Sequence, residues 1–448
     1  MESLLGATEA SALCDALTQT TSPVSLRRNP LKPFDAMPAD EAGVVPWCEN
    51  GCYLSRRPRF TYDPLLHAGC YYVQEAASMF VEQALRRILQ DFRPHRVLDL
   101  CAAPGGKSTL WRSLMPEGDL LVANEPIRQR AQILAENLTK WGHPDVVTTS
   151  AYPEEFAPLT GFFDVVAADV PCSGEGMFRK DEEAAEEWSP EAVAMCAARQ
   201  LSIVESVWPA LRQGGYLVYS TCTYNREENE DNVARICSEL GAECVEIPTD
   251  EAWHVSGDTT GRGLSVYRFF PHRTQGEGLF MALLRKTSAA PLAKDKKRRK
   301  RDEGRAAGIK NGNVVSRWLE HDAQYKLVRT SDDHIAAVRK SLFDDVMRVC
   351  DTVKALTAGI ALAEEKGRKL IPQHALALSL VLRADAFPQV ALTHEEALSY
   401  LRREALVLGA GVPRGYVVVT YSGHPLGFVN NLGSRANNLY PQEWRIRN

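Results

Sequence analysis

Several patterns that define large classes of protein are missing from this 448-residue chain. It contains no run of about 18 apolar residues, so we expect no membrane-spanning helix. Its first residues, Met1-Glu-Ser-Leu-Leu, include an acid where a secretory signal has Lys or Arg, and no long apolar stretch follows. The sequence therefore predicts a cytoplasmic protein that is not exported and binds no membrane.

Metal-binding patterns are missing as well. The eleven cysteines form no Cys-x-x-Cys unit, whereas common zinc sites need two such pairs or a Cys pair with a His pair. Cys48 and Cys52 are the closest pair, and no second pair of Cys or His accompanies them. We interpret both as structural thiols in a reducing compartment and predict no metal cofactor.

Positive charge is scarce overall, since 52 basic and 57 acidic residues leave a net charge of −5. The average hides one basic segment. Residues 285–305 hold ten basic and three acidic side chains, a net charge of +7, so the remaining residues carry a net charge of −12. A local basic stripe is sufficient to attract the phosphates of a nucleic acid. For residues 294–301 alone, a solvated linker explains the composition equally well.

The length indicates about three domains, at roughly 150 residues per domain. Residues 1–75 are rich in Pro, Arg and aromatic side chains. Residues 76–286 alternate helices with short apolar strands, which predicts a parallel sheet covered on both faces. Residues 287–312 form a basic linker, and residues 313–448 end in a β-rich region. We predict strands at 96–100, 120–123, 146–148, 164–168, 215–220, 416–421 and 424–429, and helices at 74–90, 107–114 and 128–140.

The strand at 96–100 runs into a glycine turn, and Gly106-Lys107-Ser108 looks like the end of a triphosphate-binding loop. Such a loop needs its first glycine at position 101, where this chain has Cys101. Pro104 also stiffens the turn, which therefore lacks the nest of backbone N–H groups that wraps a phosphate. The sequence thus argues against a triphosphatase.

A glycine turn after the first strand is nevertheless where doubly wound folds bind ligands. Glu125 follows the next strand, at the position where an acid binds ribose hydroxyls. Together these features describe an adenosine-type pocket without a phosphate cradle. S-adenosylmethionine fits this pocket well, and a dinucleotide fits less well because Gly-x-Gly-x-x-Gly is missing.

Two cysteines follow two other strands of the predicted sheet. Cys172 lies in Asp169-Val-Pro-Cys-Ser-Gly174, and Cys222 follows the strand at 215–220. Both loops belong to the edge that carries the glycine turn. A thiolate that adds to carbon 6 of a pyrimidine turns the ring into an enamine whose carbon 5 attacks a sulfonium methyl group. The residues alone leave open which cysteine attacks.

Two charged residues complete the predicted site. The addition step needs an acid near ring nitrogen 3, and Asp169, at a strand end beside apolar residues, is expected to be desolvated and to fill this role. Lys107 is expected to hydrogen-bond the base or the acid and to favour the thiolate. Taken singly, a turn-capping aspartate and a helix-surface lysine explain the two residues equally well.

At these residues the sequence resembles the RNA cytosine-C5 methyltransferases of the Nop/Sun family, in the RsmF-like branch that acts on bacterial ribosomal RNA. The motifs that carry the resemblance are Cys101-Ala-Ala-Pro-Gly-Gly-Lys107, Asp169-Val-Pro-Cys-Ser-Gly174 with Glu-Gly-Met-Phe-Arg-Lys-Asp181, and Ser220-Thr-Cys-Thr-Tyr-Asn225. Weaker similarity covers residues 23–30, 71–75 and 439–447, so the resemblance extends over nearly the whole chain.

The resemblance implies residue roles. In the family the Thr-Cys-Thr cysteine, here Cys222, attacks carbon 6, and the Pro-Cys cysteine, here Cys172, assists release of the product. Asp169 and Lys107 are the other implied catalytic residues. The implied contacts of S-adenosylmethionine are Cys101, Ala102, Ala103, Pro104, Gly105, Gly106, Lys107, Glu125, Ser150 and Asp169. Ser150 stands where the family usually has an acid for the adenine.

The resemblance also implies a fold and a substrate. We expect an α/β, Rossmann-like class I S-adenosylmethionine-dependent methyltransferase domain, a small N-terminal α+β domain that leads into it and binds RNA, and a C-terminal β-rich, PUA-like RNA-binding module. The expected protein is a monomer that forms 5-methylcytosine in 16S ribosomal RNA, free or within the small subunit. Two alternatives are the same chemistry on transfer RNA and a non-catalytic RNA-binding or ribosome-assembly protein on a methyltransferase scaffold.

Overall fold

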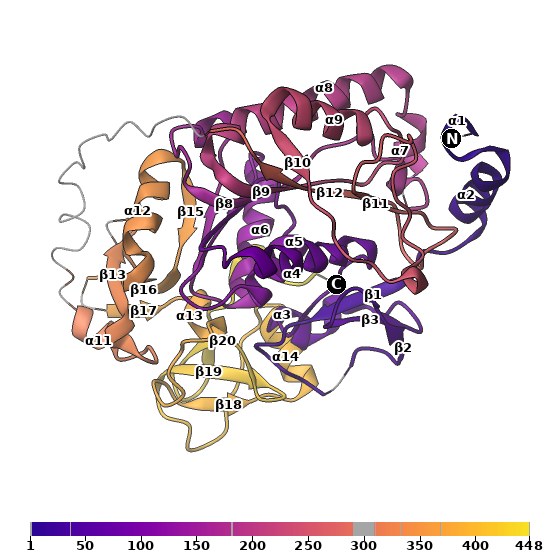
Figure 1. Cartoon of the computed structure of the whole chain (residues 1–448). Coiled ribbons are helices and arrows are strands. Elements are labelled where there is room, and N and C mark those ends of the chain that lie inside the picture. Colours follow the sequence, from indigo (N-terminus) through magenta and orange to yellow (C-terminus); the bar gives the residue numbers. More distant parts are fainter. Residues whose placement is uncertain are drawn as a thin grey trace.

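The computed structural model describes residues 2–35, 37–180, 182–289, 309, 311–331, 333–367 and 369–447. Its centre is a nine-stranded sheet (Figure 1). The strands are β5 (Arg96–Asp99), β6 (Leu120–Asn124), β7 (Val146–Thr149), β8 (Phe163–Asp169), β9 (Leu211–Thr221), β10 (Ala242–Cys244), β11 (Val266–Phe269), β12 (Leu279–Lys286) and β15 (Ala355–Ala358). They lie in the order β10-β12-β9-β8-β5-β6-β7-β15, with β11 beside β12.

The five parallel strands β5 to β9 are those predicted from the sequence. Their side chains alternate between two apolar layers: Val97 belongs to one buried cluster and Leu98 to the other. One face is covered by α4 (Val81–Asp91), α5 (Gly106–Leu114) and α6 (Arg128–Trp141), and the other by α8 (Pro190–Val207), α9 (Glu230–Leu240) and α12 (Phe343–Thr352). The predicted doubly wound α/β architecture is confirmed.

The helix predicted at 74–90 begins later than expected. A 3-10 turn, Ala77–Phe80, leads into α4. The carboxylate of Glu75 accepts hydrogen bonds from the backbone N–H groups of Ala77 and Ser78, at 2.8 Å each. Glu75 therefore caps the start of the helical segment, because a side-chain acceptor satisfies the first unpaired N–H groups.

The N-terminal part of the chain forms a small α+β unit against α5. It consists of α3 (Pro64–His67) and the sheet β2-β3-β1-β4 of Glu41–Val44, Gly51–Leu54, Val24–Arg28 and Tyr71–Tyr72. The helices α1 (Glu2–Leu5) and α2 (Ala7–Gln19) precede this sheet, and Leu13 of α2 packs instead with Tyr224 and Phe270. The buried guanidinium of Arg27 donates to Thr109 Oγ1 at 2.6 Å and to the Gly106 carbonyl at 3.2 Å. This sheet is thereby fixed to the helix that follows the glycine turn.

The C-terminal region contains two four-stranded sheets. The first consists of β13 (Tyr325–Arg329), β14 (His334–Arg339), β16 (Ile360–Lys366) and β17 (Lys369–Pro372), and the second of β18 (Gln389–Ala391), β19 (Gly415–Tyr421), β20 (His424–Asn431) and β21 (Ala436–Asn438). Their helices are α11 (Gly312–Ser316), α13 (His374–Leu378) and α14 (His394–Leu401). The strands predicted at 416–421 and 424–429 are confirmed as β19 and β20. Most of the predicted basic linker, including 294–301, lies outside the described residues.

One strand of this region belongs to the central sheet. The strand β15 pairs antiparallel with β7, and α12 packs near it on the face of the sheet that α8 and α9 also cover (Figure 1). The sequence does not predict this strand, because the short run Ala-Leu-Thr-Ala carries no pattern that distinguishes it from a loop. The C-terminal region is therefore built into the sheet that carries the candidate site.

A buried lysine joins three parts of the chain. The ammonium group of Lys32 donates to the carbonyl oxygens of Ala68, Lys140 and Leu378 at 2.9, 2.7 and 2.8 Å. These carbonyls belong to the N-terminal unit, to α6 and to α13. Burial lowers the pKa of Lys32 to about 8, and the three acceptors hold the ammonium in place.

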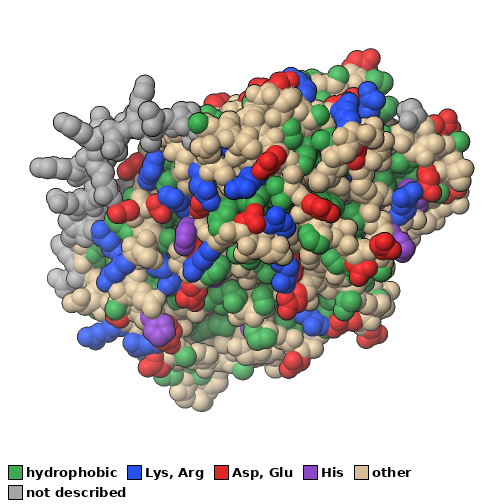
Figure 2. Space-filling view, viewed as in Figure 1, with side chains coloured by type: hydrophobic (Ala, Val, Ile, Leu, Met, Phe, Trp, Pro, Cys, Tyr) green, Lys and Arg blue, Asp and Glu red, His purple; other side chains and the backbone are tan. Residues whose placement is uncertain are grey.

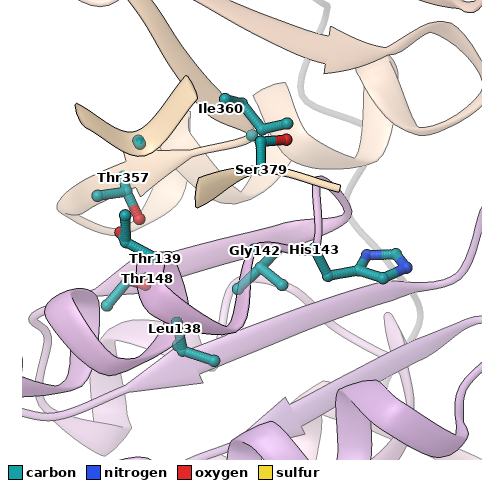
Figure 3. Close-up of a pocket in the computed structure, with 11 residues that line it drawn as sticks. Leu138, Thr139, Gly142, His143, Thr148, Thr357, Ile360 and Ser379 are labelled. Atoms are coloured by element: carbon teal, nitrogen blue, oxygen red, sulfur yellow. The ribbon is translucent and has the colours of Figure 1, made fainter. Parts of the chain in front are cut away.

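A small pocket of about 30 Å³ lies where α6 and β7 meet the C-terminal region (Figure 3). It has room for a water molecule or two, and the buried hydroxyl of Thr148 beside it has no hydrogen-bond partner among the described residues. None of the predicted site residues lines this pocket, which is therefore a feature of the interface between domains. Across the described ranges, no helix is both long and apolar enough to cross a membrane.

Candidate active site

The glycine turn between β5 and α5 is shaped by its backbone. Gly105 has a φ of +115°, which glycine adopts readily and other residues rarely do. The Ala103–Pro104 bond is cis, and Asn137 of α6 donates to the Pro104 carbonyl at 2.8 Å. The half-buried Cys101 precedes this bend, and burial raises the pKa of its thiol above the ordinary value. The predicted donor-binding run is thus a fixed bend at the carboxyl edge of the sheet.

Glu125 and Ser150 follow the neighbouring strands β6 and β7. The buried carboxylate of Glu125 accepts from the Ile127 N–H at 3.0 Å and lies 3.5 Å from the Arg130 guanidinium. The hydroxyl of Ser150 donates to the Pro126 carbonyl at 3.3 Å. Both residues therefore lie at the edge that carries the glycine turn, and Ser150 contributes a hydroxyl there instead of a carboxylate.

Asn124 ties these strand ends together. Its amide nitrogen donates to the carbonyls of Leu100 and Ala151 at 3.0 and 2.9 Å, and its amide oxygen accepts from the Thr149 hydroxyl at 2.8 Å. Three neighbouring strands are thus crosslinked at the point where the predicted pocket begins. The sequence did not single out this residue, because its contacts exist only once the three strand ends are adjacent.

Lys107 and Asp169 form an ion pair. The Lys107 ammonium donates to Asp169 Oδ2 at 2.8 Å, and the Ser220 hydroxyl donates to Asp169 Oδ1 at 2.6 Å. Burial opposes the charge on Lys107, but the attraction of Asp169 and Asp99 outweighs it and raises the pKa of Lys107 above its usual value. The expected desolvation of Asp169 is wrong: its side chain is 35% exposed and its charge is balanced by Lys107.

A second carboxyl group lies deeper in the same site. Asp99, the last residue of β5, is fully buried and accepts a hydrogen bond from the Ser108 hydroxyl at 2.6 Å. Burial, together with the nearby charge of Asp169, raises the pKa of Asp99 to about 7 against the opposing effect of the Ser108 bond. Sequence reasoning passed over Asp99, which is a group that can hold a proton near neutral pH beside Lys107.

The two predicted cysteines meet. Their sulfur atoms lie 3.1 Å apart, where the loops after β8 and β9 come together. The hydrogen bond from Cys172 lowers the pKa of Cys222, and the nearby charge of Lys107 acts in the same direction. The same hydrogen bond raises the pKa of Cys172 well above its ordinary value. The Cys222 thiol is therefore expected to lose its proton more readily than the Cys172 thiol.

Cys48 and Cys52, which the sequence predicts to be structural thiols, lie outside the candidate site. Cys48 and Cys52 are buried in the N-terminal unit, where burial raises their pKa values to about 12 and 11. Thiols with such pKa values stay protonated and are poor nucleophiles and metal ligands. Among the described residues, His, Cys, Asp and Glu form no group of three or more with the geometry of a metal site.

The parallel sheet, the glycine turn after β5 and the acid after β6 define a Rossmann-like class I methyltransferase domain, here with an N-terminal α+β unit and a C-terminal β-rich module. A family model described as 16S rRNA methyltransferase RsmB/F matches residues 87–285. The N-terminal domain of 16S rRNA methyltransferase RsmF matches residues 1–76, and the methyltransferase RsmF PUA domain matches residues 387–446.

Curated relatives agree with these matches. The chain is 34% identical over 421 residues to ribosomal RNA small subunit methyltransferase F of Enterobacter sp. (strain 638), covering 89% of this chain and 83% of that protein. It is 34% identical over 415 residues to the protein of the same name from Klebsiella pneumoniae (strain 342), covering 89% and 84%. The chain belongs to the ribosomal RNA small subunit methyltransferase F family.

Two solved structures share the fold of the methyltransferase domain. A methyltransferase homologue from Pyrococcus horikoshii has a TM-score of 0.51 and 25% identity, covering 63% of this chain and 92% of that one. NSun6 from Pyrococcus horikoshii with SFG has a TM-score of 0.52 and 20% identity, covering 64% and 96%. At 20% identity, the likeness to NSun6 shows the fold alone.

Proposed function

We propose that the protein methylates carbon 5 of a cytosine in RNA, with S-adenosylmethionine as methyl donor and Cys222 as nucleophile. The observation that carries the proposal is the pair of sulfur atoms 3.1 Å apart, beside the ion pair of Lys107 and Asp169. A methyltransferase scaffold that only binds RNA has no use for a low-pKa thiol at this edge of the sheet. We propose 16S ribosomal RNA as acceptor because the relatives are named for the small ribosomal subunit.

We assign the donor site to the run from Cys101 to Lys107 together with Glu125, Ser150 and Asp169. The chemistry of these residues fits the donor: Glu125 offers a carboxylate for ribose hydroxyls, and the glycines of the turn leave its backbone open to close approach. The hydroxyl of Ser150 serves the adenine end in place of an acid. The donor, when bound, supplies an electrophilic methyl group on a sulfonium centre.

In the proposed reaction the Cys222 thiolate bonds to carbon 6 of the cytosine. The electron pair of the C5–C6 double bond moves through carbon 4 to nitrogen 3, which takes a proton from the Lys107–Asp169 pair. Carbon 5 of the resulting enamine then attacks the donor's methyl group, and the sulfur–methyl bond breaks to leave a neutral thioether. Its proton passes to a base, the nitrogen 3 proton returns to the Lys107–Asp169 pair, and the bond from carbon 6 to Cys222 breaks.

Cys172 is assigned to the release step. Its sulfur lies 3.1 Å from that of Cys222, next to the carbon–sulfur bond that must break. Once Cys222 is bonded to carbon, the charge and the hydrogen bond that raise the pKa of Cys172 are lost. Cys172 is therefore a stronger acid in the adduct than in the free protein, which suits a group that handles a proton during release.

The acceptor cytosine must leave its stack to reach Cys222, so a loop cytosine or a flipped base is expected. On the face shown in Figure 2, Lys and Arg side chains gather on the left half, over elements of the C-terminal region. Basic side chains of this kind attract RNA phosphates despite the net charge of −5. This distribution and the match to a PUA domain support RNA contacts by the C-terminal region.

The proposal is tested by incubating the protein with tritiated S-adenosylmethionine and, separately, naked 16S ribosomal RNA, small subunits, large subunits and transfer RNA. We expect label on cytosine carbon 5 in naked 16S RNA or small subunits. Label in transfer RNA alone would move the acceptor to that RNA. Salt-dependent RNA binding without label in any sample would favour a non-catalytic binding protein.

Glu125→Gln is expected to weaken S-adenosylmethionine binding about tenfold, because a hydrogen bond to a charged acceptor contributes roughly 1.5–3 kcal/mol. The glutamine keeps an acceptor for the Ile127 N–H, so the strand end remains intact. Isothermal titration calorimetry measures the change, and Glu251→Ala at an exposed acid serves as control. Equal affinities for Glu125→Gln and wild type would remove Glu125 from the donor site.

A further inference from the structure

A buried carboxylate on the Cys172 loop holds the Cys222 loop. Glu175, three residues after Cys172, is 3% exposed. One of its oxygens accepts hydrogen bonds from the Thr223 hydroxyl at 2.7 Å and from the backbone N–H groups of Tyr224 and Asn225 at 2.6 and 2.9 Å. The turn that directly follows Cys222 is therefore wrapped around a side chain of the other loop.

A second carboxylate makes the reverse connection. Glu228, six residues after Cys222, is fully buried and accepts from the backbone N–H of Ser173, next to Cys172, at 3.1 Å. It also accepts from the side-chain amides of Asn225 at 2.7 Å and Gln200 at 2.5 Å. Each cysteine loop is thus held by an acid that belongs to the other loop, and we call Glu175 and Glu228 the carboxylate brace.

The backbones of the two braced loops are in direct contact. The N–H of Gly176 donates to the Cys222 carbonyl at 2.7 Å, and a Cβ at Gly176 would lie only 2.3 Å from that oxygen. The hydroxyls of Ser173 and Thr223 form a further bond at 3.0 Å. Because the backbones are in contact, the spacing of the loops fixes the spacing of the two sulfur atoms.

Activation of the nucleophile does not explain the brace. The charge of Glu228 raises the pKa of Cys222, and this opposes the effect of Lys107. Burial also removes the solvation of a carboxylate, and its hydrogen bonds must offset that loss. Glu228 therefore works against thiolate formation, and what the brace contributes is the geometry of the loops.

We propose that Glu175 and Glu228 are positioning residues that set the distance between Cys172 and Cys222 and thereby govern release of the methylated RNA. The inference rests on the proposed function. Attack on carbon 6 needs Cys222 and the bound base, whereas release also needs Cys172 beside the carbon–sulfur bond. Loosening the brace therefore slows release more than attack, and the covalent adduct accumulates.

Glu228→Gln tests the inference, because its amide N–H₂ must face either Asn225 or Gln200, which both donate to the native carboxylate. With small ribosomal subunits from cells lacking the gene, we expect turnover to fall about 10- to 100-fold, as small misplacements of reacting groups do. The fraction of protein in a denaturation-resistant RNA adduct is expected to rise several-fold. Adduct formation in a single turnover should change less than about threefold.

Two further variants make the experiment decisive. Glu227→Gln changes the adjacent acid, which is 53% exposed, and is expected to behave as wild type. Glu175→Gln retains an oxygen for the Thr223-Tyr224-Asn225 turn, so it is the milder variant if Glu228→Gln unfolds. Parallel loss of adduct and turnover in the folded variants, or no change in either, would overturn the inference. Wild-type protein that labels no RNA would instead overturn the proposed function and the inference with it.

Discussion

Replacing Cys222 by alanine is expected to lower methyl transfer by at least about 10⁴-fold, because removal of a covalent nucleophile costs most of the catalysis that depends on it. The fold should be retained, since alanine fills less space than cysteine and the Gly176 hydrogen bond goes to the backbone of residue 222. Tritium incorporation into small subunits measures the loss. Gel electrophoresis under denaturing conditions should show no covalent protein–RNA adduct.

Cys172→Ala is the matched variant, and it is expected to differ from Cys222→Ala in forming the covalent adduct. Turnover falls, but the adduct through Cys222 forms and persists, because the group assigned to release is missing. An adduct with Cys222→Ala and none with Cys172→Ala would exchange the two roles. An active double variant would show that transfer proceeds without a covalent intermediate. Cys14→Ala, at an exposed thiol, provides the control.

The second large effect is expected from Lys107→Met, at about 10²- to 10⁴-fold in rate, the usual contribution of a positioned acid or base. Methionine keeps the length of the side chain and removes the ammonium that donates to Asp169. It also removes a charge that lowers the pKa of Cys222. The thiolate then forms only at higher pH, so the rising limb of the pH–rate profile moves to higher pH.

Asp169→Asn is expected to shift the pKa of Cys222 in the direction opposite to Lys107→Met. The charge of Asp169 raises the pKa of Cys222, so its removal should move the rising limb to lower pH while the rate at the plateau falls. Profiles measured under single-turnover conditions separate the two effects, and Lys340→Met at an exposed position serves as control. Shifts in the same direction for both variants would contradict the assignment of this ion pair.

The sequence predicts the parallel sheet well, because its buried strands are short apolar runs between helical periods, as in Val165-Val-Ala-Ala168. It also predicts that Cys172 and Cys222 share one edge, since both follow parallel strands of the same sheet. Their 3.1 Å separation does not follow from the sequence, because it depends on how two irregular loops pack.

Other features depend on contacts between distant residues and could not be read locally. Asn124 looks like any polar residue at the end of a strand, and its role is visible only once three strand ends are adjacent. Glu175 and Glu228 look like ordinary surface acids in a polar stretch, because burial of a charge leaves no periodic pattern. The expected desolvation of Asp169 fails for a similar reason: its 35% exposure depends on how the surrounding loops pack, which the sequence does not show.

The strand β15 limits how this protein can be divided. A chain that ended at residue 286 would contain every residue of the candidate site, but β7 would keep only β6 as a partner and would expose a row of unpaired N–H and C=O groups on its other side. Open sheet edges of this kind promote association between chains and aggregation. The same cut would remove the Leu378 carbonyl from the buried Lys32. The C-terminal region is thus not an interchangeable recognition module, because the methyltransferase sheet is complete only when that region is attached.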